Sequence, residues 1–104
     1  MRLVTTSYVV AETATRLRYD VGLAAALRLR ESLAEAARAG SLRIVWIDRG
    51  LEAKGWEILA QYADVPLSLT DATTAAVARA QRIRELFAFD DDFAALGLIV
   101  APAR

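Results

Sequence analysis

The sequence contains no cysteine and no histidine among its 104 residues. The absence of cysteine excludes disulfide bonds and metal sites built from thiolates. The absence of histidine excludes serine–histidine and cysteine–histidine nucleophiles, and it excludes zinc sites built from imidazoles. Any catalysis by this chain must therefore rely on carboxylates or on a metal ion.

The sequence also lacks an apolar run of the roughly 18 residues that a membrane-spanning helix needs. Its first residues, Met1 to Thr6, show no signal-peptide pattern. We therefore expect a cytoplasmic protein that does not enter a membrane. The formal net charge is +0, and Lys54 is the only lysine. Any nucleic-acid binding would depend on local arginine clusters and bound metal, because no overall positive field attracts phosphates.

The composition is typical of one folded domain. Hydrophobic residues make up 56% of the chain and charged residues 25%. This apolar fraction is too high for a disordered chain, and 104 residues are too few for two separate cores.

Helical spacing of apolar residues, together with capping residues, predicts four helices. Gly40 is expected to end the second helix, and Asp48 to cap the third. The first predicted helix is capped by Thr6 or Ser7, runs through Leu17 and breaks at residues 19–22. The other three run from Leu23 to Ala39, from Arg49 to about Ala63, and from Thr70 to about Arg82.

Short segments rich in apolar and β-branched residues predict buried strands at Leu42–Ile47, Glu85–Phe89 and Leu98–Ala101. A short helical turn is expected from Phe93 to Leu96. Strands that alternate with helices predict an α/β domain with a mostly parallel sheet.

Glu12 is the first of several acidic residues in unusual positions. It lies among Val9, Val10 and Ala11, where burial of an unpaired carboxylate would be costly. The alternative places Glu12 on the solvent side of its helix, paired with Arg16 four residues later.

Two further acidic sites lie at the ends of predicted elements. Asp71 is in the first turn of a helix, where a carboxylate also favours the helix dipole. Asp90, Asp91 and Asp92 directly follow a predicted strand, and functional groups gather at strand ends in α/β sheets. A divalent cation would relieve the repulsion among these three carboxylates, although a helix cap with solvated acids is an alternative.

Three segments in this order and spacing resemble the PIN domain, and in particular the VapC-type toxin of a VapBC toxin–antitoxin pair. They are Thr6–Thr13, Leu67–Ala72 and Phe87–Phe93 with Gly97 after it, and the resemblance covers nearly the whole chain. It implies a PIN-like three-layer domain that cleaves RNA phosphodiester bonds as an endoribonuclease toxin, counteracted by a cognate antitoxin.

The same resemblance implies that the catalytic residues are metal ligands. These are Glu12, Asp71 and Asp90, with Asp92 as a frequent fourth acid. Oxygen-only ligation suits Mg²⁺ or Mn²⁺. The implied reaction is metal-assisted hydrolysis, in which the ions activate a water and neutralise charge on the scissile phosphate.

Two departures from the family pattern affect these expectations. PIN domains open with a central strand that ends in an aspartate, whereas the resemblance here begins near the later helix that carries Glu12. Ala88 also stands where the family usually has threonine or serine. We therefore expect an N-terminally incomplete PIN-like domain with weak metal binding and little ribonuclease activity. A degenerate, non-catalytic PIN domain that only dimerises or binds an antitoxin is the alternative.

The same incompleteness predicts self-association. Without the central strand, Ile44–Ile47 and Leu86–Phe89 would lose hydrogen-bonding partners along apolar edges. Toxins of this type commonly dimerise, and the apolar helix from Leu23 to Ala39 offers a surface. A homodimer or a higher oligomer is therefore expected.

Overall fold

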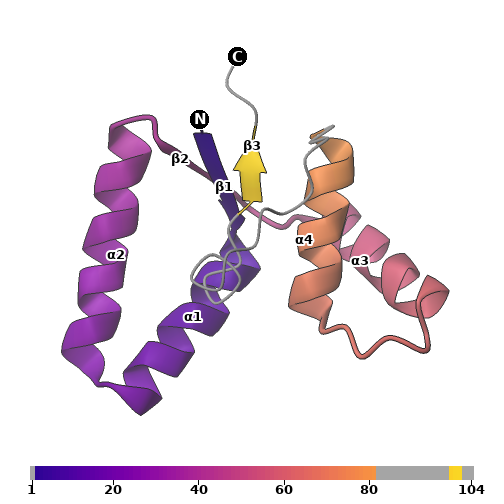
Figure 1. Ribbon diagram of the computed structural model, residues 1–104, viewed down its shortest axis with the longest axis horizontal. Coiled ribbons are helices and arrows are strands. Elements are labelled where there is room, and N and C mark those ends of the chain that lie inside the picture. Colours follow the sequence, from indigo (N-terminus) through magenta and orange to yellow (C-terminus); the bar gives the residue numbers. More distant parts are fainter. Residues whose placement is uncertain (1, 82–98, 102–104) are drawn as a thin grey trace.

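The computed structural model describes residues 2–81 and 99–101. Figure 1 shows the strands between two pairs of helices, α1 with α2 and α3 with α4. This arrangement agrees with the α/β class predicted from the sequence. The elements in chain order are β1 (Arg2–Thr6), α1 (Ser7–Asp20), α2 (Leu23–Arg38), β2 (Leu42–Val45), α3 (Arg49–Gln61), α4 (Leu69–Ala80) and β3 (Ile99–Ala101). The expected strand Glu85–Phe89 and helical turn Phe93–Leu96 lie outside the described residues.

The described strands form a mixed sheet in the order β2-β1-β3. β1 pairs with β2 in parallel, from Leu3 opposite Leu42 to Thr6 opposite Val45, and pairs with β3 in antiparallel orientation. The central strand β1 was not predicted. β1 pairs with Ile44 and Val45, which were expected to lack a neighbouring strand, so that expectation is wrong for this edge of β2.

Capping interactions explain where the helices begin and end. The Thr6 hydroxyl accepts a hydrogen bond from the Val9 amide at 3.2 Å, and the Asp48 carboxylate accepts one from the Leu51 amide at 2.8 Å. Gly22, with φ of 140°, separates α1 from α2, and Gly40 follows α2 with φ of 77°. Both glycines adopt backbone conformations that side chains disfavour. The capping role predicted for Asp48 and the stop predicted at Gly40 are confirmed.

The core lies between the sheet and the α3–α4 pair. Val4 from β1 packs against Val77 and Ala78 of α4, and Ile58 of α3 packs against Ala72 and Ala76. By contrast, α2 has no buried residue. Within residues 2–81 and 99–101, no helix is long and apolar enough to span a membrane.

The helices α3 and α4 approach each other closely at Gly55, which is buried on α3. A Cβ atom added there would lie 2.7 Å from Cγ2 of Thr73 and 3.4 Å from Cδ1 of Leu69. The Thr73 hydroxyl donates to the carbonyl oxygens of Leu69 and Thr70, at 2.8 and 3.0 Å, which fixes the orientation of its methyl group. The two helices therefore approach this closely because residue 55 has no side chain.

Candidate metal centre

The parallel strands β1 and β2 end at the same edge of the sheet, where Thr6 lies opposite Val45. The helix α1 starts directly after Thr6, and residues 46–48 connect β2 to α3. The Ser7 hydroxyl accepts a hydrogen bond from the Ile47 amide at 2.9 Å, so the start of α1 is joined to this connection. This edge is where α/β domains commonly place their functional groups.

A second contact joins α1 to α3 at this edge. The Tyr8 hydroxyl donates a hydrogen bond to the Glu52 carboxylate, across 44 residues of sequence. This hydrogen bond, with smaller contributions from desolvation and from the Glu52 charge, raises the pKa of Tyr8 above its ordinary value of 10.0. Tyr8 therefore keeps its proton at neutral pH and acts as a donor. Neither residue carries a local sequence signal for this contact.

Glu12 lies one helical turn beyond Tyr8, on the same side of α1. Its side chain is exposed, so the carboxylate carries no burial cost. The position of Glu12 agrees with the solvent-side alternative, and its carboxylate is accessible to a cation.

Asp71 is the third residue of α4 and forms a capping box with Ser68. The Ser68 hydroxyl accepts from the Asp71 amide at 3.0 Å, and the Asp71 Oδ2 accepts from the Ser68 amide at 3.1 Å. Asp71 therefore helps to cap the start of α4. An ionised carboxylate has about four acceptor positions, so this single bond leaves room for a metal ion.

The described part of the chain contains two of the four expected ligands, on helices α1 and α4, which contact each other. Asp90 and Asp92 lie outside the described residues. Within the residues that the structure describes, no three acidic side chains group closely enough to hold a metal ion. The convergence of Glu12, Asp71 and Asp90 therefore stays a prediction.

Comparison with known proteins identifies the fold around these carboxylates. Residues 1–98 match the PIN domain family. The chain belongs to the PIN-domain family. Over 98 residues it is 34% identical to the 23S rRNA-specific endonuclease VapC20 of Mycobacterium tuberculosis, in both strain CDC 1551 and strain H37Rv. That match covers 93% of this chain and 71% of VapC20.

The crystal structure of Mycobacterium tuberculosis VapC20, a sarcin-ricin loop cleaving toxin, is also similar to this PIN domain. The TM-score is 0.68 at 35% identity, and the match covers 95% of this chain and 74% of that one. The PIN-like α/β fold and the resemblance to VapC-type toxins, both expected from the sequence, are confirmed.

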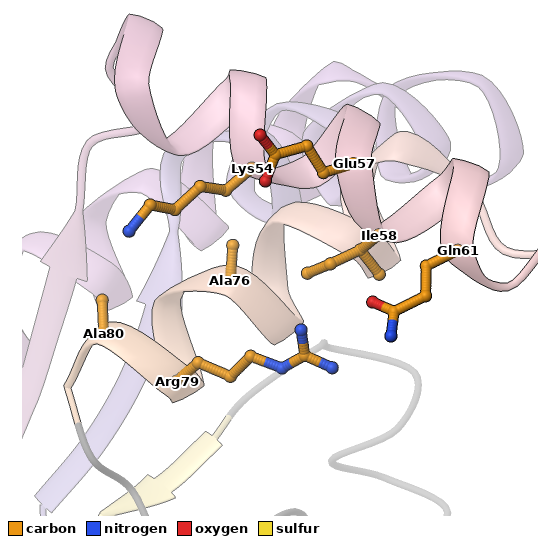
Figure 2. Close-up of a pocket in the computed structure, with 7 residues that line it drawn as sticks. All are labelled: Lys54, Glu57, Ile58, Gln61, Ala76, Arg79 and Ala80. Carbon is orange, nitrogen blue, oxygen red and sulfur yellow. The ribbon is translucent and has the colours of Figure 1, made fainter.

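A groove of about 340 Å³ lies elsewhere in the PIN domain, between α3 and α4 (Figure 2). Its lining contains neither Glu12 nor Asp71, the two candidate ligands that the structure describes. The lining residues are Lys54, Glu57, Ile58, Gln61, Ala76, Arg79 and Ala80.

Proposed function

We propose that this PIN domain is an endoribonuclease toxin that hydrolyses RNA with the help of Mg²⁺ or Mn²⁺. The observation that carries the proposal is the similarity to a 23S rRNA-specific endonuclease over 93% of the chain. We assign Glu12, Asp71, Asp90 and Asp92 as the catalytic metal ligands.

The donor chemistry fits a hard divalent cation. The chain has no histidine or cysteine, so its strong ligands are oxygens, which Mg²⁺ and Mn²⁺ prefer. Glu12 is exposed, and Asp71 uses only one hydrogen bond of its carboxylate for capping. Both side chains are therefore available to a cation.

When bound, the cation would stabilise charge on the scissile phosphate and lower the pKa of a water. The residues of the chain would hold the ligands in place. The Thr6 cap and the Ser7–Ile47 hydrogen bond fix the start of α1, and the capping box fixes Asp71 at the start of α4. Such support keeps ligands close to their working geometry before the substrate binds.

The proposed partners are RNA, a cognate antitoxin and a second copy of the chain, all in the cytoplasm. VapC20 is a sarcin-ricin loop cleaving toxin, so RNA with this loop is the substrate to test first. The end of α1, the connection after it and the start of α2 expose four apolar side chains, which are 49–82% accessible: Tyr19, Val21, Leu23 and Leu27. Exposed apolar side chains close together in the sequence are consistent with a protein interface, which supports binding of an antitoxin or dimerisation.

The test of this function is cleavage of a synthetic hairpin RNA that carries the sarcin-ricin loop sequence. We expect slow cleavage by the 104-residue chain with Mg²⁺ or Mn²⁺, none with EDTA, and none by the Asp90→Asn variant. Glu35→Gln, which alters an exposed acid on α2, should leave cleavage unchanged. Cleavage that survives both EDTA and Asp90→Asn would contradict the proposal. A folded chain that binds this RNA without cutting it would support the non-catalytic alternative.

A further inference from the structure

Trp46 is the first residue of the connection between β2 and α3, and 77% of its surface is exposed. Tryptophan side chains are on average highly buried, so an indole presented to solvent is unusual. At surfaces that bind single-stranded nucleic acid, exposed aromatic rings stack on the bases. The ring of Trp46 is available for this kind of contact.

The backbone on both sides of Trp46 is fixed. Val45, directly before it, lies opposite Thr6 in the parallel pair of strands. Directly after it, the Ile47 amide donates to the Ser7 hydroxyl at 2.9 Å, and Asp48 then caps α3. Because this backbone is already ordered, binding of a ligand to Trp46 does not require the connection itself to become ordered.

Trp46 lies at the same edge of the sheet as the start of α1, the helix that carries Glu12. The hydrogen bond from Ile47 places the connection against Ser7, at the start of α1. Glu12 is five residues further along this helix, about 7.5 Å along its axis at about 1.5 Å per residue. Arg49, three residues after Trp46, is exposed and can contact a phosphate next to a stacked base.

We propose that Trp46 is a base-stacking platform that binds an unpaired base of the RNA next to the cleavage site, with Arg49 on the adjoining phosphate. This inference rests on the proposed function, because it presumes that the chain acts on RNA. It adds a substrate-binding residue to a site whose other assigned residues are carboxylates.

The experiment measures affinity for the same sarcin-ricin hairpin in EDTA, so that no cleavage occurs. Trp46→Ala should weaken binding roughly 5- to 100-fold, as expected for the loss of one stacked base. Trp46→Phe should stay within about threefold of the unaltered chain, because phenylalanine also stacks. The matched control is Trp56→Ala on α3. Trp56 is 55% exposed, and its replacement should not change the affinity for the hairpin.

Fluorescence gives a second measurement that does not depend on the alanine variant folding. In the Trp56→Phe variant, Trp46 is the only tryptophan, and the hairpin should quench its emission. An RNA duplex of equal length without the loop should quench it much less, because its bases are already stacked.

The outcomes separate this inference from the proposed function. If the chain binds and cuts the hairpin but Trp46 is not quenched and Trp46→Ala binds equally well, the stacking role is wrong and the ribonuclease function stands. If the chain neither binds nor cuts RNA, the function fails and the stacking role fails with it.

Discussion

Asp71→Asn will lower the affinity of the chain for Mn²⁺ by at least about tenfold and will abolish metal-dependent RNA cleavage. Even groups that only orient metal ligands change metal affinity by about 10–100-fold, and Asp71 is assigned as a ligand itself. The asparagine side chain keeps an oxygen that can accept from the Ser68 amide, as Oδ2 of Asp71 does at 3.1 Å. The loss of charge in the first turn of α4 should therefore cost only about 0.3–1 kcal/mol of stability.

Ser68→Ala is the matched control for Asp71→Asn, because it removes the other half of the capping box and keeps the carboxylate. It should cost about 0.5–2 kcal/mol, since the Asp71 amide loses its hydroxyl acceptor. Its Mn²⁺ affinity should fall much less than that of Asp71→Asn, because the carboxylate and its hydrogen bond from the Ser68 amide remain. Isothermal titration with Mn²⁺ and urea unfolding measure the two effects separately. If both variants lost metal affinity in proportion to their loss of stability, Asp71 would be only a capping residue.

Gly55→Ala will destabilise the chain by about 1–3 kcal/mol, the usual cost of overfilling a packed interior. In an unconstrained helix interior the same change stabilises by roughly 0.5–1 kcal/mol, because alanine favours helix. At Gly55 the new methyl group would meet Cγ2 of Thr73 at 2.7 Å. Thr73 cannot easily turn away, because its hydroxyl donates to the carbonyl oxygens of Leu69 and Thr70.

Two further variants test this explanation by urea unfolding. Thr73→Ser removes Cγ2 and keeps the hydroxyl, so Gly55→Ala should cost much less in a Thr73→Ser background, as in a double-mutant cycle. Gly50→Ala is the control on the same helix, where the added Cβ would meet only Oδ1 of Asp48 at 3.5 Å. If Gly55→Ala were as stable as Gly50→Ala, close packing would not explain the glycine.

The helices were predictable from the sequence because their signals are local. Asp48 caps α3, Gly40 follows α2, and α2 begins at Leu23 as expected. The strand β2 ends at Val45, two residues before the predicted Ile47, because the backbone amide of Ile47 turns to the Ser7 hydroxyl instead of a neighbouring strand.

Other features depend on contacts that no local pattern reveals. β1 has only Leu3 and Val4 as apolar residues, and its place at the centre of the sheet comes from pairing with β2 and β3. The contact between Tyr8 and Glu52 joins residues 44 positions apart. Asp71 shows a further limit, because a capping carboxylate and a metal-binding carboxylate in the first turn of a helix have the same sequence signature.

The central claim is that Glu12, Asp71, Asp90 and Asp92 bind metal at one site. Its most direct test is the loss of NMR amide signals on titration with Mn²⁺, because this paramagnetic ion broadens only nearby nuclei. We predict that signals around Glu12, Asp71 and residues 90–92 weaken together at the same low Mn²⁺ concentration, before those around Glu35. Weakening confined to one of these segments, or shared equally by Glu35, would contradict a common metal centre.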